Sequence, residues 1–187
     1  MKLNYASFLT AGLLMVTGAN ANAGVAFDLY TGLTAGLGGQ RFTVDDHHKS
    51  DSAKSFGVVA GVDIPFVRLE AEYNYMDGKN ANIQIGTLNA YVKMSGLTII
   101  TPYVGGGIGM IWKVDVDKDF LPFNYDETDK AVFQGMLGTT LDIPTLPFKI
   151  DIEGRVMYAP KLIEIATLNE TASGTHYDAR VKLRYVF

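Results

Sequence analysis

Alternation of charged and apolar residues is the dominant pattern in this sequence, and it is clearest at the C-terminus. Residues 176–187 read HYDARVKLRYVF, in which every second position from Asp178 to Arg184 is charged and the positions between them are apolar. Side chains on a β-strand point to opposite faces in turn, whereas an amphipathic helix repeats every 3.6 residues. The segment is therefore predicted to be a strand with one charged face and one apolar face.

The same period of two recurs through the rest of the chain. No uninterrupted apolar run reaches the roughly 20 residues that a membrane-spanning helix needs. We predict eight strands, at residues 25–37, 55–64, 67–75, 87–94, 103–112, 133–142, 149–158 and 176–187.

The links between these predicted strands alternate in length. Those after the second, fourth and sixth strands are short, whereas the links after the first and fifth strands include the polar stretches 42–54 and 114–130. Short turns at one end and long loops at the other are typical of outer-membrane barrels. The sequence therefore predicts an all-β fold, an eight-stranded antiparallel up-and-down transmembrane β-barrel.

The N-terminus has the features of a secretory signal peptide. Lys2 supplies a positive charge, residues 6–16 are apolar, and residues 21–23 read ANA, with small residues at the two positions that a signal peptidase reads. We predict a signal peptide at residues 1–23 and a barrel domain at residues 24–187. Export of this kind places the protein beyond the inner membrane of a bacterium, or outside a cell.

Composition excludes several kinds of chemistry. The chain has no cysteine, so it forms no disulfide, no thiolate metal site and no cysteine nucleophile. Its net charge of −4 gives no sign of nucleic-acid binding. We expect no cofactor and no nucleic-acid partner.

Alternation alone leaves two orientations open. A soluble lipocalin-like barrel has hydrophobes inside, whereas a membrane barrel has them outside, against lipid. The export signal, the long links at one end, the aromatic residues near strand ends and the glycines on the polar face all favour the membrane orientation. A soluble periplasmic barrel is the alternative.

The charged faces then meet inside the barrel. An eight-stranded barrel is only wide enough for its side chains to fill it, and buried charges need partners. We predict an ion-pair network in the lumen and a filled scaffold in place of an open pore. Its predicted members are Asp28, Arg68, Glu70, Glu72, Lys93, Lys149, Asp151, Glu153, Arg155, Asp178, Arg180, Lys182 and Arg184, and His176 also lies on this face.

Two motifs resemble a known family. The terminal KLRYVF, with Tyr185 two residues before Phe187, resembles the C-terminal signature of bacterial outer-membrane proteins. Residues 102–112, PYVGGGIGMIW, resemble a strand of the small opacity/OmpX/OmpA-like barrels, a family often labelled as porins. The resemblance implies that Tyr185 and Phe187 are an assembly signal for the barrel assembly machinery. It also implies a location in the bacterial outer membrane, with lipid and lipopolysaccharide as partners.

The stretch DDHHKSD at residues 45–51 contains residue types that could bind zinc or nickel. Neighbouring residues on an extended chain point apart and no second ligand set is evident, so we expect a solvated loop and no metal site. His48, Ser50 and Asp51 are also the components of a nucleophilic triad, although nothing in the sequence orients them. Residues 115–129 are acid-rich but lack the spacing of a calcium loop. The apolar residues among them could contact lipopolysaccharide or a partner, or pack over the barrel mouth.

Three functions follow from this reading. The first is a non-enzymatic scaffold that displays four surface loops, for membrane integrity, adhesion or host contact with an unknown ligand. The second is a narrow porin-type channel. The third is a lipid-A-modifying enzyme.

Overall fold

The protein is an eight-stranded closed β-barrel. The computed structural model describes residues 27–44, 47–78, 81–94, 99–116, 130–143, 145–165 and 170–187. The strands are β1 (Asp28–Val44), β2 (His47–Asp63), β3 (Val67–Gly78), β4 (Ala81–Lys93), β5 (Ile100–Val116), β6 (Lys130–Asp142), β7 (Phe148–Ile165) and β8 (Glu170–Val186). The predicted signal peptide at residues 1–23 lies outside the described residues and stays a prediction.

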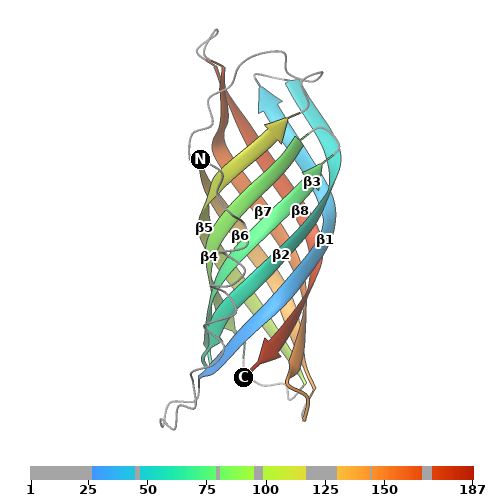
Figure 1. Ribbon diagram of the computed structural model, residues 1–187, viewed down its shortest axis with the longest axis vertical. Helices are drawn as coiled ribbons and strands as arrows, with labels where there is room; N and C mark the ends of the chain where they lie inside the picture. Colours follow the sequence, from blue (N-terminus) through green and yellow to red (C-terminus); the bar gives the residue numbers. More distant parts are fainter. Residues whose placement is uncertain are drawn as a thin grey trace, which may run out of the picture.

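Each strand pairs antiparallel with the next, and β8 pairs with β1 to close the sheet (Figure 1). The closing register runs from Tyr30 opposite Val186 to Thr43 opposite Ser173. The backbone N–H of Phe187 donates to the carbonyl oxygen of Leu29 at 2.9 Å, so the last residue of the chain continues this seam. The predicted fold class, an all-β antiparallel barrel of eight strands in chain order, is confirmed.

The two ends of the barrel differ. At the turn end, β2–β3, β4–β5 and β6–β7 are joined, and Phe187 also lies there, at the bottom of Figure 1. At the loop end, the links between strands span residues 45–46, 79–80, 117–129 and 166–169. No helix in the described part of the chain is long and apolar enough to cross a membrane.

The strands are longer at the loop end than the alternation predicts. Most of the stretch 42–54, predicted to be a long polar link, belongs to β1 and β2, which are paired in register up to Val44 opposite His47. Similarly, β7 extends to Ile165 and β8 begins at Glu170. The prediction of a long first link was wrong because backbone pairing continues where polar residues occupy both faces of the strands.

The charged faces of β3, β7 and β8 point inward in the middle of the barrel. On β8, Lys182 and Arg180 are 0% and 2% exposed, whereas their neighbours Leu183 and Val181 are 45% and 51% exposed. The same contrast holds on β3, where Arg68 and Glu70 are buried and Leu69 between them is exposed. In this part of the barrel, large apolar side chains therefore cover the outside and charged ones fill the inside.

Candidate functional site

The candidate site is the interior of the barrel, where twelve charged side chains form what we call the ion-pair network. They come from β2, β3, β4, β7 and β8, and six acids balance six bases. The acids are Asp63, Glu70, Glu72, Asp151, Glu153 and Asp178, and the bases are Arg68, Lys93, Arg155, Arg180, Lys182 and Arg184. Burying a charge is costly without a partner, and each of these charges has at least one of opposite sign.

Asp151 is the centre of the group nearest the turn end. Arg184 donates to both of its carboxylate oxygens, from Nε at 2.8 Å and from Nη2 at 3.0 Å, in the bidentate geometry that arginine favours. Arg68 Nη1 lies 3.2 Å from Asp151 Oδ2, and the Thr140 hydroxyl donates at 2.6 Å. Arg184 also reaches Asp63 at 3.1 Å, and Lys93 pairs with the same carboxylate. The Asp151 carboxylate thus binds two buried guanidinium groups, those of Arg184 and Arg68.

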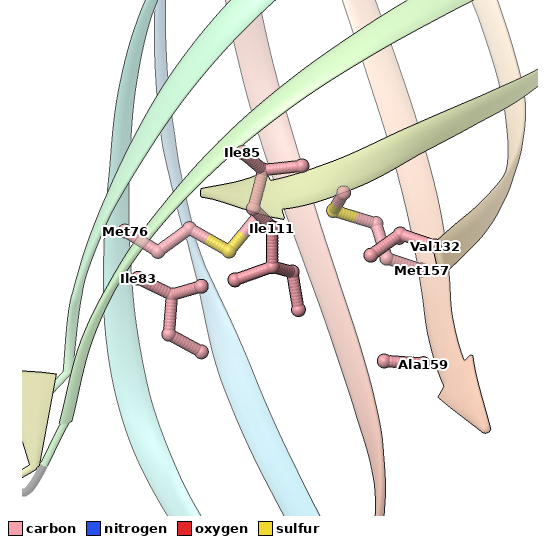
Figure 2. Close-up of a cluster of buried hydrophobic side chains, with 7 residues drawn as sticks. All are labelled: Met76, Ile83, Ile85, Ile111, Val132, Met157 and Ala159. Atoms are coloured by element: carbon pink, nitrogen blue, oxygen red, sulfur yellow. The ribbon is translucent and has the colours of Figure 1, made fainter. Parts of the chain in front are cut away.

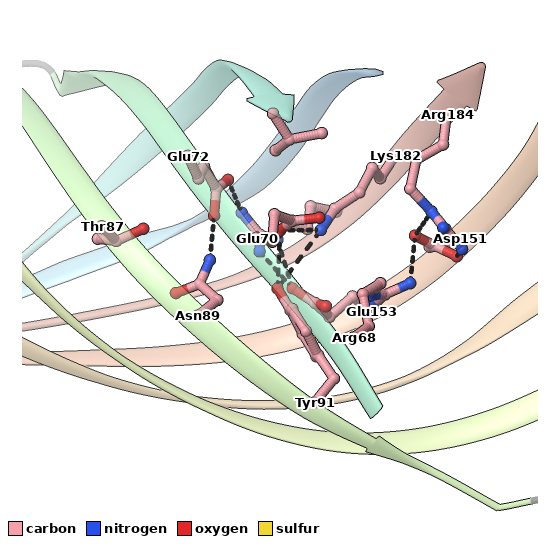
Figure 3. Close-up of polar contacts among 12 residues, drawn as sticks. Arg68, Glu70, Glu72, Thr87, Asn89, Tyr91, Asp151, Glu153, Lys182 and Arg184 are labelled. Carbon is pink, nitrogen blue, oxygen red and sulfur yellow. Dashed lines mark hydrogen bonds and ion pairs between the residues drawn. The ribbon is translucent and has the colours of Figure 1, made fainter. Parts of the chain in front are cut away.

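Glu70 is the centre of a second group (Figure 3). Lys182 Nζ lies 2.6 Å from its Oε1, and the hydroxyls of Tyr91 and Tyr30 donate to its two oxygens at 2.9 and 2.8 Å. Three strands besides β3 therefore supply donors to one buried carboxylate: β8 through Lys182, the adjacent β4 through Tyr91, and β1 through Tyr30.

A third group links β3, β7 and β8. Arg180 donates to Glu153 from Nε at 2.6 Å and also pairs with Glu72 on the opposite wall. Arg155 makes two hydrogen bonds to Asp178, at 3.0 and 2.6 Å. The Ser55 hydroxyl donates to Asp178 at 2.7 Å, and the Tyr103 hydroxyl donates to Glu153 at 2.9 Å.

Tyrosine rings pack among these charges. The guanidinium carbon of Arg68 lies 4.1 Å from the ring centroid of Tyr91 and 4.4 Å from that of Tyr103, so the group is held between two aromatic faces. Arg184 lies 4.7 Å from the ring centroid of Tyr30. Cation–π contacts of this kind stabilise guanidinium groups that have few water molecules around them.

The glycines on the inner face make room for these rings. A Cβ at Gly138 on β6 would lie 2.6 Å from the Tyr103 hydroxyl oxygen, and a Cβ at Gly61 on β2 would lie 2.5 Å from that of Tyr30. Only a residue without a side chain lets a tyrosine lie flat across the wall at these two positions. Large residues on one strand are therefore matched by glycine on its neighbour.

Gly138→Val should consequently destabilise the barrel by about 1–3 kcal/mol, because the new side chain displaces Tyr103 from Glu153. Gly135→Val on the same strand is the matched control, since a Cβ at Gly135 meets no heavy atom within 4 Å. Equilibrium urea unfolding in lipid vesicles measures both, and the control should change stability by less than about 0.5 kcal/mol. Equal losses for the two variants would show that the inner wall has no special need for glycine.

The structure places most of the predicted residues inside the barrel and two elsewhere. Asp28 and Lys149 lie at the turn-end rim, 3.7 Å apart, and the Asp28 side chain is 51% exposed. Lys149 is closer to Asp142, at 2.9 Å. Asp28 is the first residue of β1 and Lys149 the second of β7, and they lie opposite the inward residues Asp63 and Arg184, so this pair stands on the inner face at the rim, outside the twelve-residue network. His176 is buried, with Nε2 3.2 Å from Asp178 Oδ2.

Several members of the interior were missed. Asp63 is the last residue of β2, and its acid side chain was not assigned to the network. The three tyrosines, Tyr30, Tyr91 and Tyr103, stand on the polar face of the period-two pattern, and that position was the signal that could have identified them. Neutral side chains also take part: Asn89 donates to Glu72 at 3.0 Å.

Toward the loop end, the interior is apolar where a polar lumen was expected. Figure 2 shows a cluster of buried side chains from β3, β4 and β5 that faces a second set from β6 and β7. Its members are Met76, Ile83, Ile85, Ile111, Val132, Met157 and Ala159. The outward neighbours on β4, Asn82 and Gln84, are polar. Near the loop end the inward side chains are therefore apolar and the outward ones on β4 are polar, the reverse of the middle of the barrel.

The cluster borders a small, partly open cavity of about 30 Å³. The accessible wall of the cavity is almost entirely apolar. Gln40 and His176 line its other side, and both are more than nine-tenths buried. Among the described residues, neither Gln40 Nε2 nor His176 Nδ1 has a hydrogen-bond partner.

The remaining candidates from the sequence are the possible metal ligands and triad residues at 45–51 and the acid-rich segment at 115–129. Asp45, Asp46 and the residues 117–129 lie outside the described residues. In the part of the chain that the structure describes, no group of three or more acidic or histidine side chains could hold a metal ion. Ser50 is exposed and Asp51, the next residue of β2, is on the opposite face, where its Oδ1 accepts from Ser52 N–H at 2.8 Å. The side chains of Ser50 and Asp51 therefore point to opposite faces of β2.

Tyr185 and Phe187 belong to an aromatic cluster on the outer face at the turn end. The ring centroids of Tyr185 and Phe187 are 5.0 Å apart, and Phe148 lies 5.3 Å from Tyr185, both in edge-to-face geometry. The cluster spans the junction of β7 and β8, at the end of the strand that closes the barrel.

The fold is similar to those of two solved small barrels. Neisserial surface protein A is similar with a TM-score of 0.58 and 12% identity, over 83% of this chain and 96% of that one. The N-terminal β-barrel domain of Pseudomonas aeruginosa OprF is similar with a TM-score of 0.56 and 12% identity, over 84% of this chain and 97% of that one. Comparison with protein-family models finds no match, and comparison with curated protein sequences finds none either.

These observations define the class of protein. A closed barrel of eight antiparallel strands, apolar outside and charged inside, has the fold and the side-chain distribution of a small outer-membrane β-barrel.

Proposed function

We propose that this chain is a bacterial outer-membrane protein whose barrel lies in the bilayer with its apolar outer face against lipid. Exposed aromatic residues at two levels support this placement: Phe148, Tyr185 and Phe187 toward the turn end, and Trp112 and Tyr158 toward the loop end. Aromatic girdles at the two membrane interfaces are typical of such barrels. Lipid and lipopolysaccharide are the partners that this placement implies.

The loop end of the barrel then extends beyond the bilayer. There the outward residues become polar, as at Asn82 and Gln84, and the inward ones become apolar. That distribution is the one expected of a barrel surrounded by water. The strands thus carry the four links at this end away from the membrane surface.

The function that we propose is a closed scaffold that displays these links for membrane integrity, adhesion or host contact. The observation that carries the proposal is the ion-pair network, which bridges opposite walls through pairs such as Arg180 with Glu72 and Lys182 with Glu70. A lumen crossed by bonded side chains is a poor path for solutes. The proposal assigns no catalysis to the chain.

Single-channel recording in planar bilayers tests the scaffold against the porin-type alternative. The purified barrel should give no discrete openings, while a porin of about 16 strands, which has an aqueous channel, serves as the positive control. Frequent, large and uniform openings by the unmodified protein would contradict a closed scaffold and favour a channel.

Assembly through the terminal aromatic residues is part of the same proposal. Tyr185 and Phe187 remain exposed at the end of β8, where the barrel assembly machinery would contact them. The role is supported by their position at β8, because the edge of β8 stays exposed until it pairs with β1 and closes the barrel.

A further inference from the structure

We propose that the outer face of β1, β2 and β8 near the loop end binds the phosphate monoester of an acylated glycolipid of the lipid A type. The site consists of five exposed side chains, which we call the phosphate patch: Arg41, Ser50, Ser52, Lys54 and Tyr177. The inference rests on the proposed placement of the barrel in the outer membrane, and it adds a specific head-group site to that placement.

The strand register brings the two cations of the patch to either side of a row of small residues. Arg41 on β1 lies opposite Ser50 on β2, and Gly39 lies opposite Ser52 in the next outward row toward the turn end. Lys54 follows in the row after that. Successive outward rows are about 7 Å apart, so the long side chains of arginine and lysine can both reach a group bound over the middle row.

Tyr177 on β8 adds a hydroxyl at the middle row. It lies opposite Gly39, and a Cβ at Gly39 would lie 2.8 Å from Tyr177 Oη and 3.0 Å from Cζ. The phenol ring therefore leans across β1 and brings its hydroxyl to the level between the two cations. The ring is 47% exposed, so the hydroxyl is accessible to a ligand on the outer surface.

The charge of the patch fits a phosphate monoester. Such a group carries about two negative charges and three acceptor oxygens, and the patch offers two cations and three hydroxyl donors. Arginine binds phosphate oxygens in a bidentate manner. A phosphodiester has a single charge and two unesterified oxygens, so it uses the patch less fully. On the outer face, Asp77 lies opposite Lys54, but within the described part of the chain the two form no ion pair.

The apolar outer face begins directly beside the patch, on its turn-end side. Leu37, opposite Lys54, is 67% exposed, and Phe56, the next outward residue of β2, is 52% exposed. Acyl chains attached to a head group in the patch would lie along these side chains. A water-soluble phosphate lacks that contact, and this continuity of charge and hydrocarbon points to a lipid.

Amide NMR of the full barrel in phosphatidylcholine nanodiscs tests the site, with diphosphoryl lipid A as the probe. The signals of Gly39 and Ser52 should shift saturably, whereas the signal of Lys113 should not, because β5 lies on the opposite side of the barrel. Phosphatidylglycerol, a diester, and inorganic phosphate should produce only weak shifts. If either of them matched lipid A, or if Lys113 shifted as much as Gly39, the assignment to a glycolipid monoester would be overturned.

Failure of this site is distinguishable from failure of the membrane placement. In the same nanodiscs, the methyl groups of Val181 and Leu183 should show nuclear Overhauser effects to lipid chain protons, because both are exposed on the outer face. If they do so while lipid A leaves Gly39 and Ser52 unshifted, the phosphate patch is wrong and the placement stands. If they show no contact with lipid chains, both proposals are wrong.

Substitutions test the two cations separately. Arg41→Gln and Lys54→Gln should each weaken lipid A binding about fivefold, and the double substitution about 30-fold, since each removes one charge at the membrane surface. Lys113→Gln is the matched control, because it removes one cation from the outward position opposite Gln84 on the other side of the barrel. It should leave lipid A binding unchanged. An equal loss from Lys113→Gln would indicate general attraction of charge and would contradict a specific patch.

Discussion

Asp151→Ala should destabilise the barrel by about 3–5 kcal/mol, since it leaves two buried guanidinium groups without their shared carboxylate. Arg184 would lose both of its bonds to Asp151, and Arg68 would lose its ion pair with that residue at 3.2 Å. Reversible urea unfolding in lipid vesicles, followed by the fluorescence of Trp112, measures the change.

Asp142→Ala is the control for this prediction. Asp142 also pairs with a cation, Lys149 at 2.9 Å, but its side chain is 38% exposed at the turn-end rim. Exposed ion pairs contribute roughly 0–1 kcal/mol, so this variant should remain close to the unmodified protein. If the two variants lost the same stability, burial of the network would not be what makes Asp151 important.

Val181→Arg on the outer face should destabilise the membrane-embedded barrel by about 2–4 kcal/mol, the cost of a cation near the bilayer midplane. Val181 is 51% exposed and lies on β8 midway between the outward aromatic residues Tyr177 and Tyr185. The same unfolding experiment in vesicles measures the effect.

Ser50→Arg provides the matched control at the loop end. Ser50 is exposed on β2, opposite Arg41, and lies beyond the level of Tyr177. Near or outside the interface, the cost of an arginine falls to roughly 0–1 kcal/mol. A Val181→Arg barrel as stable as the Ser50→Arg barrel would mean that Val181 does not face hydrocarbon.

The middle of each strand could be predicted from sequence because one face is uniformly apolar there. In β8, the alternation of Ala179, Val181 and Leu183 with Asp178, Arg180 and Lys182 fixes both the strand and its orientation. Period two survives wherever one face is apolar and the other charged, and this is why strand number and order agree with the structure.

The ends of the strands could not be predicted, because polar residues there occupy both faces. Residues 42–54 contain acids, histidines, lysines and serines without alternation, yet β1 and β2 remain paired through them. Backbone hydrogen bonds, which carry no sequence signal, extend the ladder. The apolar cluster was missed for a related reason: Ile83 and Ile85 are apolar at inward positions, and the rule of polar residues inside reverses near Thr87.

The partners within the network were also beyond sequence reasoning. Arg180 bonds Glu153 on the adjacent β7 and Glu72 on β3 across the lumen, and only the second contact depends on the shape of the closed barrel. Pairing across a lumen is set by barrel diameter, strand stagger and side-chain length together. The sequence predicted which charges would need partners, and the structure supplies the partners.

The central claim is that the apolar outer face contacts lipid, and the single tryptophan tests it without substitution. Trp112 is 55% exposed on the outer face, where it packs 5.7 Å from the ring of Tyr73. In vesicles whose acyl chains carry bromine at carbons near the head group, its fluorescence should be strongly quenched, and aqueous acrylamide should quench it weakly. The claim would be contradicted if acrylamide quenched Trp112 efficiently, brominated lipid had no effect on its fluorescence, and the barrel stayed in solution without detergent.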